Sequence, residues 1–259
     1  NQNYKITLKN NKNYFVRICN EIPEHLIKRE NEINASNAAS SIGASPKLIY
    51  SNNKLLVFDF IQGKTLSERD VQENLIELVK LLRKVHTDIP KKLDGVSQIF
   101  WVFHVIKHYN NFLNNNENKY KTILNDLVIK SEKIENQSSP FDIIYGHNDL
   151  LAANFIKKNK KFYLVDWEYA GYNTPLFDLG GLSSNNNFDK QQEKIMLENY
   201  FEKKVGNSII HKFNCIKAVS LLRETMWSMV AEIISEIDFD YKNYTEQNLE
   251  NFYLAYKKL

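Results

Sequence analysis

The 259-residue chain predicts an α+β protein with two lobes, a small N-terminal antiparallel sheet with one helix and a larger, mainly helical C-terminal lobe. Three observations support this prediction. β-like runs occur in pairs over the first 60 residues, the pattern becomes helical after Gly63, and short strand-like runs return at 143–165. We expect residues 1–62 to form the first lobe, with a connector at Phe58–Gln62, and residues 63–259 to form the second.

Four strands and one helix are expected in the first lobe. The β-like runs cover residues 4–9, 14–19, 47–50 and 55–60. A polar segment at 10–13 separates the first two runs, which predicts a hairpin turn. The helix is expected to begin at Glu24, directly after a proline, and to end near Ser41, because Gly43 is a helix stop signal.

The second lobe is expected to contain six helices and three short strands. Apolar residues at helical spacing, among them Leu75, Leu78 and Leu82, mark the first of these helices. The helices are expected at residues 71–87, 97–114, 119–136, 189–204, 208–235 and 245–257. The strands are expected at residues 143–145, 155–158 and 162–165.

The composition is that of an ordinary globular protein, with 43% hydrophobic and 25% charged residues. The net charge of +3 is too small to indicate binding to nucleic acid or to an anionic membrane surface. No apolar run is long enough for membrane insertion, and the N-terminus lacks a signal-peptide core. Cys19 and Cys215 lie far apart without a metal-binding pattern, which favours free thiols in a reducing compartment. We therefore expect a cytoplasmic protein.

The segment 145–178 carries the residues that indicate a reaction. His147-x-Asp149 is followed five residues later by Asn154, and a short strand then leads to Asp166. A carboxylate on such a loop can orient a substrate hydroxyl for attack on a phosphoryl group. An Asn and a second Asp supply the hard oxygen ligands that suit Mg²⁺ beneath the phosphates of ATP. The pattern therefore predicts a phosphotransferase.

Each of these residues also has a purely structural interpretation. Asp149 could cap a turn, Asn154 could stabilise its own loop, and Asp166 could cap the turn after its strand. Together, at these spacings, the three residues favour the catalytic interpretation. His147 would be a poor ligand for Mg²⁺, so we expect it to form hydrogen bonds within the loop.

Arg17 stands in the second strand, where a cation can reach the phosphates of ATP from the roof of the cleft. Glu32, on the following helix, is the residue we expect to pair with it. Two solvated surface charges are the alternative interpretation. The position of Arg17 in the predicted sheet favours the functional one.

Several stretches of the sequence carry a resemblance to a known family. They are HNDLLAANF with VDWEYA in the catalytic segment, the opening NQNYKI with YFVRI and RENEINASNAASSIGASPKLIY, and MWSMVAEIISEIDFDYKNY near the C-terminus. Across nearly the whole chain they resemble the choline/ethanolamine kinase family, a branch of the aminoglycoside-phosphotransferase and protein-kinase-like group that includes bacterial choline kinases. The resemblance implies a bilobal protein-kinase-like fold, MgATP as phosphoryl donor, and choline, or alternatively ethanolamine, as acceptor. It also implies phosphocholine as product and a place in phospholipid metabolism.

The resemblance also assigns roles to individual residues. Asp149 matches the family's catalytic Asp, and Asn154 and Asp166 match the pair that holds the metal. Arg17 matches the phosphate-reaching cation, and Glu32 its helix partner. In the connector, two residues match the segment whose backbone meets adenine, namely Asp59 and Ile61. The family's glycine-rich phosphate loop would precede Asn1.

The acceptor site in this resemblance is built from aromatic residues, because aromatic faces attract a trimethylammonium group. Trp227 matches a cage tryptophan, and Phe239 and Tyr241 fall in the matching segment. Glu224 stands where the family has a second tryptophan, which makes the pocket less aromatic and more acidic. Negative charge could also come from two further carboxylates, Glu168 and Asp178. The alternative for Trp227 is a place in the helix core, and the alternative for Glu168 is to hold the loop after Asp166.

Two rival functions remain open at the level of sequence. An aminoglycoside or other small-molecule phosphotransferase would need many carboxylates around a polycationic sugar, whereas acidic residues are sparse and aromatic residues cluster near the C-terminus. A nucleotide-binding pseudokinase would fit a chain that lacks the glycine-rich loop. The presence of Asp149, Asn154 and Asp166 argues against it.

Overall fold

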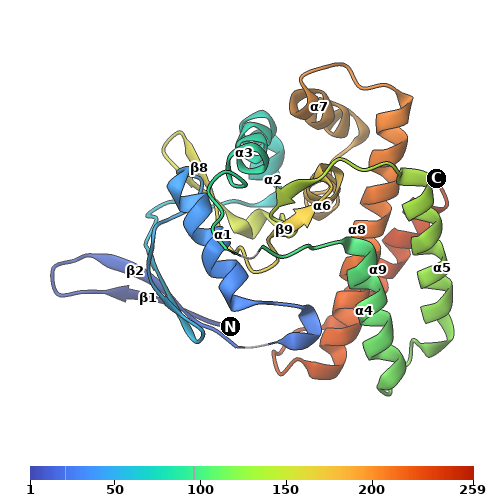
Figure 1. Cartoon of the computed structure of the whole chain (residues 1–259), viewed down its shortest axis with the longest axis horizontal. Helices are drawn as coiled ribbons and strands as arrows, with labels where there is room; N and C mark the ends of the chain where they lie inside the picture. The colour runs from blue at the N-terminus through green and yellow to red at the C-terminus, as the bar shows by residue number, and fades with distance from the viewer. Residues whose placement is uncertain (21, 96) are drawn as a thin grey trace.

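The computed structural model describes residues 1–20, 22–95 and 97–259. A four-stranded antiparallel sheet forms one end of the molecule, with its strands in the order β1-β2-β4-β3 (Figure 1). The strands are β1 (Gln2–Thr7), β2 (Asn13–Ile18), β3 (Leu48–Asn52) and β4 (Leu55–Asp59). Both predicted strand pairs are therefore present, and the two pairs join through β2 and β4.

Helix α1 (Arg29–Ser41) packs against β3 of this sheet. The prediction that it begins at Glu24 was wrong, because Pro23–His25 forms a separate 3-10 turn. Leu26 then adopts a left-handed conformation, with φ of 59°, which interrupts the helical path. The predicted end is confirmed, since Gly43 follows the helix with φ of 71°, a value that suits glycine.

The rest of the described chain is mainly helical, with two small sheets. The helices are α2 (Glu68–Glu73), α3 (Leu75–Asp88), α4 (Val102–Asn115), α5 (Lys121–Ser138), α6 (Pro175–Asn185), α7 (Lys190–Phe201), α8 (Asn207–Ile234) and α9 (Tyr241–Tyr256). The strands are β5 (Lys64–Thr65), β6 (Ile144–Gly146), β7 (Phe155–Lys158), β8 (Lys161–Leu164) and β9 (Gly171–Asn173). Antiparallel pairs β5–β7 and β7–β8 make one sheet, and β6–β9 make the other.

Three predicted helices have different bounds in the structure. The helix expected at 71–87 is divided at Asn74, and α2 begins at a capping box between Ser67 and Asp70. The segment before α4, expected to be helical from residue 97, is extended, because it exchanges backbone hydrogen bonds with Tyr172. Helix α9 begins at Tyr241 rather than at residue 245, because the Asp240 side chain caps it.

Helix α6 was not predicted, since its sequence contains two glycines and two serines, which are poor helix formers. Packing explains it. A Cβ atom on Gly180 would lie 3.0 Å from the Cα of Lys217, so the glycine lets α8 approach closely. Burial against α8 therefore overrides the low intrinsic propensity of the segment.

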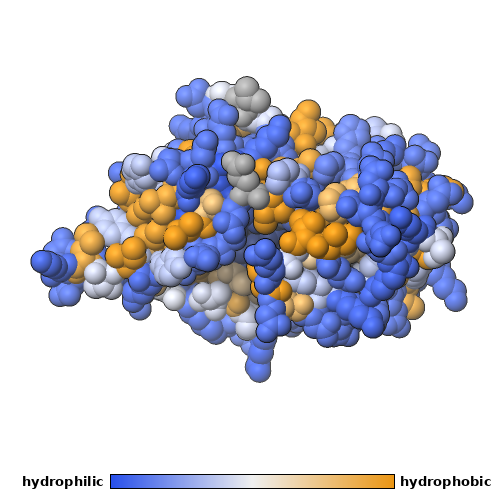
Figure 2. Space-filling model, turned by 90° about the horizontal axis from the view of Figure 1, so that it is seen from below, coloured by the Kyte–Doolittle hydropathy of each residue, from blue (hydrophilic) through white to orange (hydrophobic). Residues whose placement is uncertain are grey.

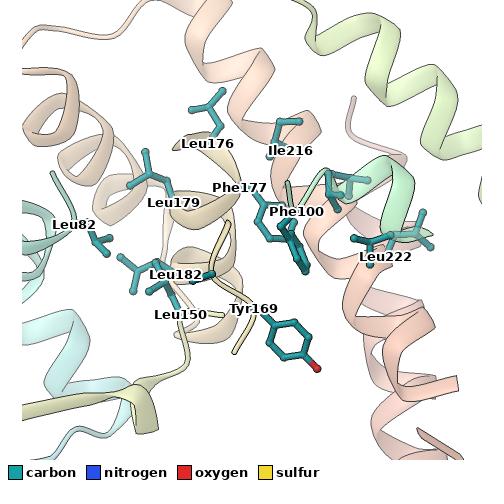
Figure 3. Packing of buried hydrophobic residues seen from close by; sticks show 14 of the residues in the cluster. Leu82, Phe100, Leu150, Tyr169, Leu176, Phe177, Leu179, Leu182, Ile216 and Leu222 are labelled. Atoms are coloured by element: carbon teal, nitrogen blue, oxygen red, sulfur yellow. The ribbon is translucent and has the colours of Figure 1, made fainter. Parts of the chain in front are cut away.

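The larger of two hydrophobic clusters in the described residues lies among the helices and includes both faces of α6. Figure 3 shows leucines of α6 on one side and side chains of α8 on the other, with Phe100 and Phe177 between them. Leu150 and Tyr169, which lie within the segment 145–178, belong to the same cluster. This packing anchors the loop to the core. The smaller cluster lies beneath the N-terminal sheet and consists of Cys19, Leu48, Leu56 and Phe58.

The surface mixes hydrophilic and apolar side chains. Apolar side chains are visible at the end of the molecule that holds the N-terminal hairpin (Figure 2), where Ile6, Leu8 and Ile18 are more than two-fifths exposed. Among the helices of the described residues, none combines the length and the apolar character needed to cross a bilayer. Both cysteines are buried free thiols, as the sequence predicted.

Candidate active site

The loop between β6 and β7 brings Asp149 and Asn154 into direct contact. The side-chain nitrogen of Asn154 donates hydrogen bonds to the backbone oxygen of Asp149 at 2.8 Å and to its carboxylate Oδ2 at 3.3 Å. A 3-10 turn at Ala152–Asn154 shapes the loop between them. Because the amide nitrogen faces Asp149, the amide oxygen Oδ1 is left for the cleft that Asn154 lines.

Asp178, on α6, fixes the start of this loop through its buried carboxylate. Its two oxygens accept hydrogen bonds from the backbone N–H groups of His147, at 2.8 Å, and Asn148, at 2.7 Å. His86 on α3 contacts the same carboxylate at 2.8 Å. Burial by itself would raise the pKa of Asp178, but the hydrogen bond and charge interaction with His86 hold it below its ordinary value. From the sequence, Asp178 was a candidate to supply negative charge to the acceptor site. The contacts show instead that its carboxylate holds the start of the loop.

His147 and Asn148 tie the loop to the chain on either side of Asp166. Asn148 has a left-handed φ of 65°, and its side-chain nitrogen donates to backbone oxygens in the segment 169–171. His147 is fully buried, and its Nε2 lies 2.9 Å from the backbone oxygen of Val165. These contacts agree with the structural role expected for His147.

Asp166 meets Arg17 across the cleft. Both carboxylate oxygens of Asp166 lie 2.6 Å from guanidinium nitrogens of Arg17, which also donates to Glu32 at 3.1 Å. Burial would raise the pKa of Asp166, but the charge and hydrogen bonds of Arg17 lower it. Asp166 has φ of 70°, an uncommon value for a non-glycine residue that is often found at functional sites. The structure thus shows the predicted Arg17–Glu32 pair and adds Asp166 to it.

A cleft of about 380 Å³ lies between the N-terminal sheet and the loops that carry Asn154 and Asp166. The connector residues Asp59 and Ile61 line it, as do apolar side chains that include Phe15. The cleft is therefore apolar near the connector and charged at its other end. This division suits a nucleotide, whose base is flat and apolar and whose phosphates are anionic.

Asp149 lines a second, much smaller cavity of about 20 Å³. The other lining residues come from the loop, α6 and α8, and they are Asn148, Leu150, Phe177, Asp178, Gly181, Ser184, Asn185, Ser220, Leu221, Arg223 and Glu224. Burial raises the pKa of Asp149 to about 8; the charge of Arg223 opposes this shift, and Glu224 adds to it. The catalytic segment therefore stands between two cavities, with Asn154 and Asp166 at the larger and Asp149 at the smaller.

Glu224 is held in place by two donors. Arg223 donates to its Oε2 at 2.8 Å, and the hydroxyl of Tyr244 donates to its Oε1 at 2.9 Å. The guanidinium of Arg223 is itself buried over the ring of Tyr169, at 4.6 Å from the ring centre. The sequence did not identify Arg223, which belongs to no motif, or Tyr244, which ends the stretch MWSMVAEIISEIDFDYKNY. Tyr244 reaches Glu224 only because α9 packs against α8.

The three aromatic residues proposed for the acceptor form one cluster. The ring centres of Trp227 and Tyr241 lie 6.1 Å apart, and those of Phe239 and Tyr241 lie 4.9 Å apart. Trp227 also stacks on His25 at 5.2 Å and donates its indole N–H to Tyr169 at 3.0 Å. Among the residues that the structure describes, the cavity at Asp149 is lined by none of these three.

Glu168 lies on the Arg17 side of the site. Its carboxylate accepts a hydrogen bond from the Asn1 side chain at 2.9 Å and lies 3.8 Å from Arg17. Burial and the nearby charge of Asp166 raise the pKa of Glu168. The structure thus brings Glu168 together with the Arg17 cluster.

Comparison with known proteins gives consistent results. A family model described as choline/ethanolamine kinase matches residues 1–195. Human ethanolamine kinase 2 is 26% identical over 264 residues, a match that covers 88% of this chain and 66% of that protein. The chain therefore spans just under two thirds of the length of this relative. The LicA homologue of Metamycoplasma hominis is 31% identical over 213 residues, which cover 79% of this chain and 78% of that protein.

Solved structures share the fold. The crystal structure of choline kinase LicA from Streptococcus pneumoniae matches with a TM-score of 0.82 at 23% identity and covers 100% of this chain and 91% of that one. Spectinomycin phosphotransferase APH(9)-Ia matches with a TM-score of 0.63 at 17% identity, over 99% of this chain and 89% of that one. These similarities confirm the predicted kinase-like fold with a small sheet and a larger helical part.

Proposed function

This chain belongs to the choline/ethanolamine kinase family, and from that premise we propose that it transfers the terminal phosphoryl group of ATP to the hydroxyl of a small amino alcohol. The acceptor class is choline or ethanolamine. One observation carries the proposal. A single loop separates a cleft large enough for a nucleotide from a small acidic cavity, and it presents Asn154 to the first and Asp149 to the second.

Asp149 is the residue proposed to act on the acceptor. Its carboxylate accepts a hydrogen bond from the acceptor hydroxyl and aligns the oxygen toward the phosphoryl group. The hydrogen bond from Asn154 and the clamp that Asp178 places on the loop fix the direction of this carboxylate. Phosphoryl transfer depends mainly on positioning and charge neutralisation, so one such carboxylate is sufficient.

Asn154 and Asp166 are the residues proposed to hold Mg²⁺. The amide oxygen of Asn154 and the carboxylate of Asp166 are hard ligands that line the same cleft, a small ligand set of the kind that Mg²⁺ takes in phosphotransferases. When bound, the ion neutralises charge on the phosphate oxygens. Arg17 stands at the same place and can donate to those oxygens, with Glu32 fixing its orientation. Asp59 and Ile61 lie where the connector can meet the adenine base.

A coupled assay for ADP formation tests the proposal. The purified chain is incubated with MgATP and, separately, with choline, ethanolamine, kanamycin or no acceptor. We expect ADP release that depends on the amino alcohol and disappears in Asp149→Asn. Turnover with kanamycin alone would favour an aminoglycoside phosphotransferase. ATP binding without turnover of any acceptor would favour a nucleotide-binding pseudokinase.

A further inference from the structure

The small cavity beside Asp149 is lined by oxygen atoms that can accept hydrogen bonds. The hydroxyl of Ser184 donates to the backbone oxygen of Gly181 at 3.3 Å, and that of Ser220 donates to Lys217 at 2.8 Å. Because the hydroxyl protons are engaged in this way, each oxygen keeps lone pairs free to accept a hydrogen bond. The carboxylates of Asp149 and Glu224 add further acceptors.

The charge of the cavity is negative. Among the described residues that line it, three carboxylates, those of Asp149, Asp178 and Glu224, face one guanidinium, that of Arg223. Asp178 is engaged by the loop and by His86, and Arg223 donates to Glu224. Burial raises the pKa of Asp149 to about 8, so Asp149 is largely protonated at neutral pH, and the two other carboxylates still outnumber the guanidinium. The cavity therefore keeps a surplus negative charge that a monovalent cation would balance.

The carboxylate of Glu224 is oriented before any ligand binds. It receives one donor on each oxygen, from Arg223 and from Tyr244, whereas an ionised carboxylate offers about four lone-pair sites. Roughly half of its accepting capacity therefore remains for a ligand in the cavity. Arg223 is only 3% exposed, so its hydrogen bond to Glu224 is shielded from solvent.

A quaternary ammonium fits this lining poorly. It has no N–H group, and its methyl groups are best recognised by aromatic faces. Among the described lining residues, Phe177 supplies the aromatic surface of the cavity. Trp227, Phe239 and Tyr241 do not line it, and Phe239 adjoins it only through Tyr244, with ring centres 5.6 Å apart. An ammonium that carries N–H groups can donate to the oxygens of Asp149 and Glu224, which a quaternary ammonium cannot do.

We propose that Glu224 selects the acceptor by receiving an N–H group of its ammonium while Asp149 receives its hydroxyl. This inference rests on the proposed kinase function and narrows the substrate class. The chain then prefers ethanolamine, and those of its N-methylated derivatives that retain an N–H, to choline.

A methylation series tests the inference. Ethanolamine, N-methylethanolamine, N,N-dimethylethanolamine and choline are all cations at neutral pH, and they carry three, two, one and no N–H groups on nitrogen. We expect KM to rise gradually over the first three and then by at least tenfold for choline. In Glu224→Gln, KM should rise at least tenfold for ethanolamine and less than threefold for choline, with the KM for ATP within twofold of the wild type. The preference for ethanolamine should therefore largely disappear.

Two further variants make the test specific. Tyr244→Phe removes one of the donors that hold Glu224, so it should shift the same preference in the same direction by a smaller factor. Glu232→Gln is the matched control, because Glu232 lies on the same helix but bonds to Tyr120 and Lys119. It should leave all four KM values within twofold. Melting temperatures of the variants show whether each one folds.

The outcomes separate this inference from the proposed function. Turnover of the series with choline preferred, or an equal effect of Glu224→Gln on all four acceptors, would overturn the role of Glu224 and leave the kinase assignment standing. If Glu224→Gln does not fold, Tyr244→Phe is measured in its place. A wild-type preference for choline, or an equal effect of Tyr244→Phe on all four acceptors, would then overturn the role of Glu224. No turnover of any acceptor by the wild-type chain would overturn the proposed function itself.

Discussion

The two cavities that flank the catalytic segment differ in how they are built. The proposed nucleotide cleft has walls from separate parts of the fold, the N-terminal sheet, the loop before β7 and the loop after β8, and it measures about 380 Å³. The acceptor cavity lies between α6 and α8, which pack tightly in the core, and it measures about 20 Å³. The larger cleft has room for a nucleotide, whereas the smaller cavity has room for little more than a water molecule, so an acceptor that binds there would have to displace side chains of its walls.

The largest expected effect comes from Asp149, the residue that connects the two cavities. Asp149→Asn keeps the shape of the side chain but removes the carboxylate that aligns the hydroxyl. We expect turnover to fall by several orders of magnitude, while the fold and MgATP binding are kept. Steady-state kinetics beside calorimetric ATP binding measures both. Near-normal turnover in this variant would contradict the assignment of Asp149 and the division of labour between the cavities.

The variant Asp166→Ala tests the role proposed for the larger cleft in binding MgATP. Asp166→Ala removes the carboxylate that we assign to Mg²⁺ and that neutralises Arg17. We expect Mg²⁺-dependent ATP binding to weaken by at least tenfold, with much less change in acceptor binding. Titration with ATP in the presence and absence of Mg²⁺ checks this. If the dependence on Mg²⁺ were the same in both proteins, Asp166 would not be the metal ligand.

The same contrast explains what the sequence could predict. Asp149, Asn154 and Asp166 lie close together along the chain, and their spacing reflects the local geometry of one loop and one strand. The partner of Arg17 could also be predicted, because the strand and the helix that follow one another must pack. Of these residues, Asn154, Asp166 and Arg17 line the larger cleft and Asp149 lines the smaller cavity, and the predicted pair of Arg17 and Glu32 is present.

The acceptor side depends on contacts between distant helices, which leave no local pattern. Ser184 on α6 lines the same cavity as Arg223 and Glu224 on α8 only because α6 forms. The glycines of α6 have low helix propensity, so the sequence did not predict this helix. Tyr244 reaches Glu224 from α9, which begins four residues earlier than predicted. The aromatic residues were identified from the resemblance, but sequence could not show that they stand apart from the cavity at Asp149.

The pH dependence of stability tests whether His25, which packs against Trp227, is buried in the folded protein. It is 4% exposed and stacks on Trp227, and burial lowers its pKa to about 3. The unfolded chain therefore takes up a proton near pH 6.5 that the folded chain does not. The contribution of neutral His25 to the free energy of unfolding should be fully present above pH 6.5. It should fall by about 1.4 kcal/mol per pH unit as the pH drops from 6.5 toward 3.

The variant His25→Phe keeps an aromatic ring beside Trp227 and removes the titration. We expect its stability to decline less steeply than that of the wild type between pH 6.5 and 4, as measured by denaturant unfolding. His104→Gln, at an exposed position on α4, is the control. Parallel pH profiles for wild type and His25→Phe would show that His25 is not kept neutral by the core.

Trp227 gives the smallest expected effect and separates two ways of recognising an ammonium. Trp227→Leu keeps an apolar side chain and removes the aromatic face. If the cluster of Trp227, Phe239 and Tyr241 attracts a quaternary ammonium, KM for choline should rise by roughly 2- to 30-fold, the equivalent of about 0.5–2 kcal/mol. The KM for ethanolamine should change less, because its N–H groups can bond to Glu224. The KM for ATP should stay near the wild-type value.

The structure also gives Trp227 a supporting role, since it stacks on His25 and donates to Tyr169. That role alone predicts a lower melting temperature and an equal effect on every acceptor. Trp101→Leu is the matched control, because Trp101 is another partly buried tryptophan whose indole N–H has a partner, Glu135. A loss of stability in both variants, with choline kinetics unchanged in Trp227→Leu, would assign the aromatic cluster to packing. Recognition of the ammonium would then rest on Glu224 alone, and choline would lose the part of the site that suits its methyl groups.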